Sequence, residues 1–417
     1  AGGNGGKGLA ARGTHPIVNV TVYGGAGGNG EGGAQGGTQL GAYAQGGAGI
    51  VGSNLTIVNS GIISGGLAGD GVTRANSLQL GGSNNSLTLQ AGSVLNGGVV
   101  AQGTGNTLRL EGTNIEDDAF EGFSRIHAAS GSNWRLAGRF LPAGNLAVTV
   151  DGSGATPAQL AMNGFISRIG SLTVDGGGTL ALGSPNAYLG GTTIKTGTTV
   201  QIGTAGALGA GTVTLDGGTL AATSSLDLTN NLTFATGQRS TVAAAGGKSL
   251  GIGGSLWLGA GASAGFGSAA RDGRVRPGSR TTPLTSNAAV VVAGGTLQVS
   301  DTARAGTILA NVASTTVEAG ATLDLNGYTI TIGNLQGAGT LNTRTGAGAA
   351  QATTVQSGNF SGAITGTGQL VKTTASTLTL TGASTYTGGT TISAGRLQIG
   401  DGGRPTRNVV NHGTLGL

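Results

Sequence analysis

Short runs in which apolar and polar residues alternate follow one another along the whole chain. Residues 172–174 read Leu-Thr-Val and residues 378–380 read Leu-Thr-Leu, with apolar side chains at every second position. Successive side chains of a β-strand point to opposite faces, so each run predicts a strand with one buried and one solvent-facing side. Apolar residues spaced for an amphipathic helix over ten residues are missing, and we therefore expect an all-β protein.

The runs are separated by tight glycine turns, and the combination repeats. Residues 172–180 read Leu-Thr-Val-Asp-Gly-Gly-Gly-Thr-Leu, and residues 213–220 read Val-Thr-Leu-Asp-Gly-Gly-Thr-Leu. Degenerate repeats of this kind predict a solenoid, in which each coil buries its apolar residues only by stacking on its neighbours. We expect a right-handed parallel β-helix with roughly 20 residues per coil. The alternative, an array of β-sandwiches, requires antiparallel hairpins with longer apolar segments.

Composition changes this picture little, but it removes two other classes of protein. The chain has 417 residues, 89 of them Gly, with 37% hydrophobic and 9% charged residues. The glycines do not occupy every third position, which excludes collagen, and the low charge with regular Leu, Val and Ile argues against disorder. Cys is absent, so stability comes from the fold rather than from disulfides. The formal net charge of +5 is a mild bias that permits anionic partners without requiring one.

One segment resembles a known family of secreted proteins. Residues 377–400 read Thr-Leu-Thr-Leu-Thr-Gly-Ala-Ser-Thr-Tyr-Thr-Gly-Gly-Thr-Thr-Ile-Ser-Ala-Gly-Arg-Leu-Gln-Ile-Gly, which resembles the passenger-associated repeat of bacterial autotransporters (type V secretion). Residues 180–203, 120–138 and 49–61 resemble other passenger segments more loosely. The resemblance implies a β-helix exported through the outer membrane by a C-terminal barrel, and hence a place at the bacterial surface or outside the cell.

These observations predict the organisation of the chain. We expect residues 1–48 to form a Gly-rich cap or first irregular coils, and residues 49–417 to form the β-helix passenger. Residues 270–283 carry no alternating pattern, which predicts a loop insertion. The translocator barrel that the resemblance implies is expected to be absent from these 417 residues.

The predicted loop carries most of the candidate chemistry. It holds four arginines, Arg271, Arg274, Arg276 and Arg280. Guanidinium groups bind sulfate, phosphate and carboxylate through paired hydrogen bonds, so the cluster indicates a docking loop for a glycosaminoglycan or an acidic receptor. A solvated loop without a partner is the alternative interpretation. An acidic group occurs at Glu111, Glu116, Asp117, Asp118 and Glu121.

Matches to catalytic and cofactor-binding motifs are expected by chance in a chain so rich in Gly. Gly25, Gly27 and Gly30 fit a dinucleotide-binding pattern, but no helix follows to hold a pyrophosphate. Residues 261–265 fit Gly-x-Ser-x-Gly, again without the helix that a nucleophile elbow needs. The three histidines lie far apart and lack metal-ligand spacing. We therefore expect no catalytic site, cofactor or metal.

With catalysis set aside, the resemblance leaves two binding roles, which differ in whether the passenger acts at the cell surface or after release. The first is a virulence-associated surface adhesin or self-association module, whose partner is host matrix, glycosaminoglycan or a second copy. The second is a released passenger that acts as a ligand for a host-cell receptor. Neither role requires nucleic acid or a membrane span in this chain.

Overall fold

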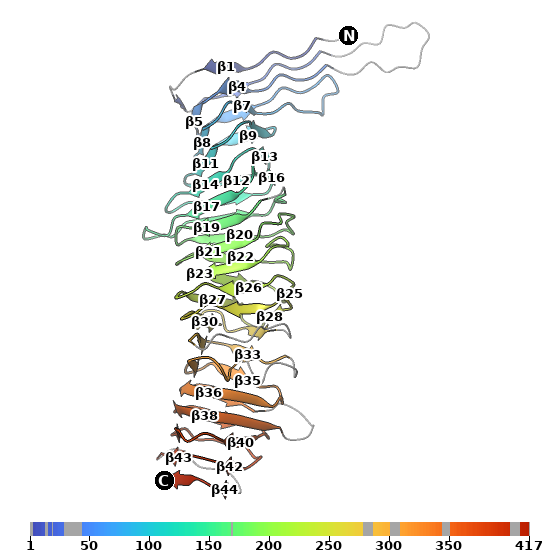
Figure 1. Ribbon diagram of the computed structural model, residues 1–417. Coiled ribbons are helices and arrows are strands. Elements are labelled where there is room, and N and C mark those ends of the chain that lie inside the picture. The colour runs from blue at the N-terminus through green and yellow to red at the C-terminus, as the bar shows by residue number, and fades with distance from the viewer. Residues whose placement is uncertain are drawn as a thin grey trace, which may run out of the picture. The chain divides into compact units, whose positions relative to one another are not determined.

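A computed structural model describes residues 3–12, 16–18, 20–28, 44–167, 170–277, 287–300, 309–343, 351–400 and 409–416. Within these ranges every secondary-structure element is a β-strand, and the strands stack in parallel as a β-solenoid, which confirms the predicted fold class (Figure 1). No helix in the described ranges is long and apolar enough to span a membrane. The chain divides into two compact units, residues 1–192 and 193–417.

The first unit consists of stacked parallel sheets, each built from one short strand per turn. The first sheet contains β1 (Leu9–Arg12), β4 (Ile50–Ser53), β7 (Leu78–Gly81), β10 (Val99–Ala101), β13 (Phe120–Glu121) and β16 (Phe140–Leu141). The second contains β2 (Ile17–Val18), β5 (Thr56–Asn59), β8 (Ser86–Leu89), β11 (Thr107–Leu110), β14 (Arg125–Ala128), β17 (Leu146–Val150) and β19 (Leu172–Asp175). Two further groups are β3 (Val22–Tyr23), β6 (Ile62–Ser64) and β9 (Val94–Asn96), and β12 (Thr113–Glu116), β15 (Asn133–Leu136), β18 (Gln159–Met162) and β20 (Thr179–Leu182).

The second unit repeats this plan. One sheet runs β22 (Thr199–Ile202), β24 (Thr219–Ala222), β27 (Arg239–Ala244), β30 (Ser263–Phe266), β32 (Ala289–Val292), β34 (Ser314–Val317), β36 (Ile330–Gly337) and β38 (Ala352–Phe360). It continues from β38 along two lines, through β40 (Gln369–Lys372), β42 (Thr390–Ile392) and β44 (Val409–Asn411), and through β41 (Thr377–Leu380), β43 (Arg396–Ile399) and β45 (Thr414–Gly416).

Two other groups of strands complete the second unit. A seven-stranded sheet contains β25 (Leu226–Leu228), β28 (Ser249–Ile252), β31 (Arg274–Pro277), β33 (Thr296–Gln298), β35 (Thr322–Asp324), β37 (Thr340–Asn342) and β39 (Ala363–Thr365). The third group contains β23 (Val213–Asp216), β26 (Leu232–Phe234) and β29 (Leu256–Leu258), and β21 (Thr192–Lys195) begins at the last residue of the first unit.

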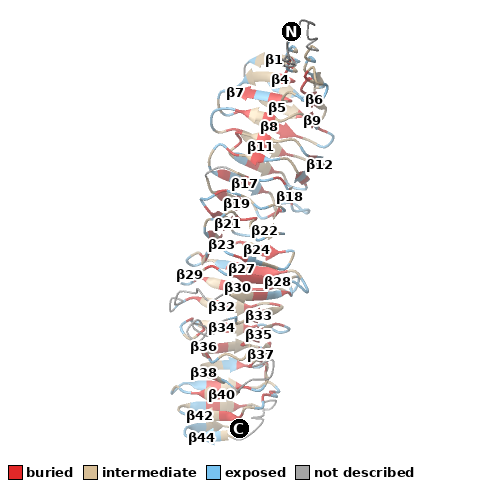
Figure 2. Ribbon diagram, turned by 90° about the vertical axis from the view of Figure 1, so that its right-hand side faces the viewer, coloured by how far each residue is buried: buried red, intermediate tan, exposed pale blue. Residues whose placement is uncertain are grey.

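The length of a turn agrees with the spacing read from the sequence. Val99 pairs with Leu78 on one side and with Phe120 on the other, 21 positions away in each direction. Buried residues alternate with half-buried or exposed ones along strands such as β17 and β20. Figure 2 colours the ribbon by this burial. Burying each Leu, Ile or Val side chain contributes roughly 1.5–3 kcal/mol, and stacking many such turns multiplies this gain.

Larger side chains fill parts of the interior in both units. In the first unit, the rings of Phe120 and Phe140 stack with centroids 6.2 Å apart, and Phe123 meets Phe120 edge-on at 6.1 Å. In the second unit, Phe234 and Phe266 lie 6.1 Å apart. Stacked aromatic residues on consecutive turns add packing energy because their rings keep the spacing that aromatic pairs favour.

Glycine-rich segments of the first unit form an arm beyond β1 and β4 (Figure 1). Its residues 3–8, 24–28, 44–49 and 64–69 are joined by backbone hydrogen bonds that recur every three residues. Segment 3–8 bonds to segment 44–49 through Gly5 N to Gln45 O (2.8 Å) and Gly8 N to Ala48 O (3.0 Å), and segment 24–28 bonds to segment 64–69 through Gly24 N to Ser64 O and Gly27 N to Leu67 O (2.8 Å each). Segment 24–28 also bonds to segment 3–8 through Gly25 N to Gly6 O (2.7 Å) and Gly28 N to Gly3 O (2.8 Å). Segment 64–69 bonds to segment 44–49 through Gly66 N to Gly47 O (2.8 Å) and Gly69 N to Ala44 O (2.9 Å). A period of three is typical of extended helices with three residues per turn.

The close approach of these segments requires glycine. A Cβ atom at Gly47 would lie 1.9 Å from the carbonyl oxygen of Gly6, and one at Gly5 would lie 1.9 Å from that of Gly25. Within residues 1–48, the arm is attached to a first turn of strands, because β1, β2 and β3 pair with β4, β5 and β6.

Candidate functional site

The four arginines predicted to form a docking cluster do not share one loop. Arg274 and Arg276 lie in β31, which pairs with β28 on one side and β33 on the other. Arg271 precedes the strand and exchanges two backbone hydrogen bonds with Ser268. Arg280 lies outside the described residues. The predicted insertion at 270–283 is therefore wrong for residues 274–277, where one buried residue, Val275, is enough to anchor a strand in the stack.

Arg276 is engaged in an ion pair that crosses a neighbouring strand. Its Nη2 atom lies 3.1 Å from Oδ1 of Asp227, two strands away in β25. Gly251 of β28 stands between them in register, and a Cβ atom there would lie 1.8 Å from that same Asp227 oxygen. Glycine thus leaves the gap through which the two side chains meet.

Polar side chains continue across the seven-stranded sheet from Arg274. Its Nη1 atom donates to Oε1 of Gln298 at 3.4 Å, and Nε2 of Gln298 donates to Oδ2 of Asp324 at 2.8 Å. Asn342 donates in turn to Oδ1 of Asp324 at 3.4 Å. The guanidinium groups of Arg274 and Arg276 therefore have internal partners, which reduces what they offer to an acidic ligand.

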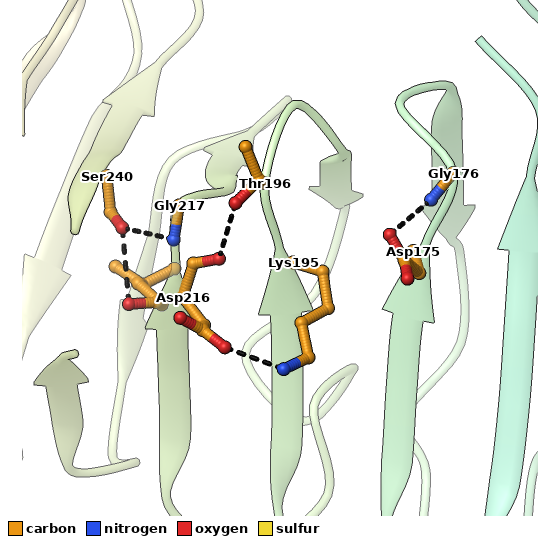
Figure 3. A network of polar contacts seen from close by, with 8 residues as sticks. Asp175, Gly176, Lys195, Thr196, Asp216, Gly217 and Ser240 are labelled. Atoms are coloured by element: carbon orange, nitrogen blue, oxygen red, sulfur yellow. Dashed lines mark hydrogen bonds and ion pairs between the residues drawn. The ribbon is translucent and has the colours of Figure 1, made fainter. Parts of the chain in front are cut away.

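A comparable link joins outward positions of β21 and β23 in the second unit (Figure 3). Nζ of Lys195 donates to Oδ2 of Asp216 at 2.6 Å, and Oγ1 of Thr196 donates to the Asp216 carbonyl at 3.3 Å. Beside them, the hydroxyl of Ser240 accepts from the amide of Gly217 at 2.9 Å and donates to the Leu215 carbonyl at 3.2 Å. These contacts tie successive turns together rather than form a reactive site.

The acidic group predicted from the sequence is partly assembled. Carboxylate oxygens of Glu116, Asp117 and Asp118 lie within 4.8 Å of one another. The pKa of Glu116 is raised to about 7, chiefly by burial and in smaller part by the charges of Asp118 and Asp117, while backbone hydrogen bonds oppose the shift. Burial also raises the pKa of Asp118.

Backbone amides already use oxygens of this group. Oε1 of Glu116 accepts from the Asp118 amide at 3.1 Å, and Oδ2 of Asp118 accepts from the Gly97 amide at 2.9 Å. Glu111 is engaged elsewhere, with Nε of Arg109 at 2.6 Å. We therefore assign no metal to the cluster.

An outward row of uncharged residues crosses the long sheet of the second unit and is here called the uncharged row. Register aligns one outward residue from each of eleven successive strands, and all of them are half-buried or exposed. They are Thr199, Thr219, Thr241, Gly265, Val291, Thr316, Gln336, Asn359, Thr379, Gln398 and Gly416. At a strand spacing of about 4.8 Å, the row is about 48 Å long.

Sequence reasoning predicted polar outward positions but not this row. Neighbours in the row are 18–26 residues apart in the chain, and the offset changes from turn to turn, as between Thr219 and Thr241 and between Gly265 and Val291. The alternation of apolar and polar residues within a strand does not determine how many residues separate paired positions on neighbouring strands. Only the register of the folded sheet brings the uncharged side chains into line.

Two segments share a buried tyrosine at the same place in a turn. The hydroxyl of Tyr188 lies 2.7 Å from Oγ1 of Thr192, and that of Tyr386 lies 2.6 Å from Oγ1 of Thr390. Burial raises the pKa of Tyr188 to about 12 and also raises that of Tyr386. The shared contact indicates that the two segments are copies of one structural repeat.

Comparison with known proteins agrees with this repeat. Residues 172–202 and 370–399 both match the passenger-associated-transport-repeat family, and each match includes one of the two tyrosines. Neither the curated proteins nor the solved structures contain a match to the chain.

Proposed function

We propose that this chain, an autotransporter passenger domain by its two passenger-associated-transport repeats and its parallel β-solenoid, is the self-association module of a surface adhesin. The passenger family implies export by type V secretion to the cell surface or the extracellular space. The proposed role is binding rather than catalysis. It includes adhesion and a contribution of adhesion to virulence.

The observation that carries the proposal is the uncharged row. Its Thr and Asn side chains both donate and accept hydrogen bonds, so each can pair with its own kind. Gln336 and Gln398 already bond within the chain, to Asn334 and to Arg396. A second copy presents the same side chains at the same spacing of about 4.8 Å, and the match therefore extends along the whole row. The absence of charge from the row removes the electrostatic repulsion that would otherwise oppose contact between identical surfaces.

Charge placed in the row tests the proposal. In an antiparallel two-fold pair of rows, Thr241 faces Thr379 of the other copy and Thr316 faces itself. We expect the triple variant Thr241→Lys, Thr316→Lys and Thr379→Lys to weaken self-association at least tenfold, since facing like charges cost roughly 1 kcal/mol each near a hydrated surface. Sedimentation velocity of the purified chain and clumping of bacteria that display it are the measurements.

The matched control carries the same charges on another sheet of the same unit. Thr296→Lys, Thr322→Lys and Thr340→Lys occupy consecutive outward positions of the seven-stranded sheet. Self-association should persist in this control. Equal loss in both triple variants would attribute association to net charge and contradict a specific row.

A released ligand for a host-cell receptor is the second candidate. Arg274 supports it, because this side chain is exposed and its hydrogen bond to Gln298 is long, at 3.4 Å. This side chain borders a recess of about 330 Å³ that Lys248 and Asp272 also line. A saturable signalling response of host cells to the soluble passenger, lost in Arg274→Gln, would favour this candidate over self-association.

A further inference from the structure

The outward face of the first sheet of unit 1 is hollowed into a groove of about 610 Å³, a size typical of ligand sites, which range over roughly 300–1,000 Å³. Strands β1, β4, β7 and β10 cross it. The side chains that matter for binding are Lys7, Arg12, Val51, Gln79, Val100 and Gln102. All six lie at half-buried or exposed positions.

Register explains how residues so far apart in the chain meet in the groove. Ala10, Val51, Gln79 and Val100 are consecutive outward neighbours on the four strands and form the floor. Lys7 precedes β1, and Arg12 is its last residue. Five residues of extended chain separate their Cα atoms by about 16 Å. The floor is thus apolar with one amide, and a cation stands at either end.

The polar groups of the groove are available to a ligand. Among the described residues, the side chains of Lys7 and Arg12 make no ion pair, and those of Gln79 and Gln102 make no internal hydrogen bond. The residues that line the groove include two cations and no carboxylate. Glu121 follows Val100 in the same row, one strand beyond this lining.

We propose that the groove binds a short acidic oligosaccharide. Carboxylate or sulfate groups pair with Lys7 and Arg12, because charge-assisted hydrogen bonds to such anions are the strongest that the groove offers. The amides of Gln79 and Gln102 donate and accept, which matches sugar hydroxyls that do the same. The apolar faces of the sugar rings lie on Val51 and Val100. The site is separate from the uncharged row, which belongs to the second unit.

The test measures affinity of the whole chain for three sugars and one peptide. Isothermal titration uses a heparin-derived hexasaccharide, hexagalacturonate, neutral maltohexaose and hexaglutamate. We expect at least one acidic sugar to bind about tenfold more tightly than maltohexaose and hexaglutamate. Binding of heparin alone would identify a sulfated glycan as the ligand, and binding of hexagalacturonate would identify uronate carboxylates.

Variants locate the site. Lys7→Gln with Arg12→Gln should weaken binding of the acidic sugar at least tenfold, and Val51→Glu should abolish it by placing an anion on the floor. The control, Arg125→Gln with Arg135→Gln, removes two exposed cations of the same unit outside the groove. Equal affinity for neutral and acidic sugars, tighter binding of hexaglutamate, or full affinity in the Lys7/Arg12 variant would overturn the proposal. Absence of binding by both acidic sugars would do so as well.

Discussion

At the residue scale, Glu116 is a buried carboxyl that lies beside two other acidic residues. It is 3% exposed and lies in β12, where Leu136 of β15 is its partner in register. Its neighbours Asp117 and Asp118 add negative charge to the loss of hydration, so the neutral form is favoured in the folded chain. A carboxyl of this kind makes stability depend on pH in the direction opposite to a paired surface carboxylate.

Glu116 predicts a loss of stability in the first unit as pH rises. Its pKa is about 7 in the folded chain and near 4.5 when unfolded, so its contribution is complete below pH 4.5 and is lost as pH rises through 7. The loss is at most about 3 kcal/mol. Denaturation followed by the buried Trp134, in a Trp257→Phe background, measures it. Glu116→Gln should flatten this pH dependence, and an identical pH profile in that variant would refute the assignment.

At the scale of elements, the parallel strands were predictable and their partners were not. Alternation at residues 172–174 and 378–380 marks strands without ambiguity, because one buried face imposes a period of two. The strand at residues 274–277 could not be predicted, because Arg-Val-Arg-Pro has a single buried apolar residue and therefore no alternating pattern. The ion pair between Arg276 and Asp227 could not be predicted from the sequence either, because it depends on a glycine at position 251 and on the register of three strands.

The glycine arm predicts a sharp difference between two substitutions. Gly47→Ala places a methyl group 1.9 Å from the Gly6 carbonyl and should separate the segments of the arm, which exposes the chain at Lys7 to trypsin. Gly6→Ala is the control, because a Cβ atom at Gly6 has nothing within 4 Å. Limited proteolysis read by mass spectrometry should show faster cleavage after Lys7 only in Gly47→Ala. Equal rates in the two variants would contradict the packing of the arm.

At the scale of the whole molecule, each unit repeats one architecture and places a different surface on it. The first unit carries the groove between Lys7 and Arg12, and the second carries the uncharged row. Neither surface could be foreseen from the sequence, because each gathers residues from several turns of unequal length. The fold class and the family were predictable from the sequence. The alternation that marks the fold lies within single strands, and the segment that resembles the family, residues 377–400, spans little more than one turn.

Cross-linking through a single cysteine tests the proposed self-association of the chain most directly. The chain contains no Cys, and Thr316 is the sixth of eleven positions in the uncharged row. In a two-fold pair of rows aligned antiparallel and in full register, the central residue faces its own copy. The account predicts that Thr316→Cys forms a disulfide dimer on mild oxidation and that Thr322→Cys, on the seven-stranded sheet, stays monomeric. Dimers of Thr322→Cys alone, or equal dimerisation of both variants, would contradict it.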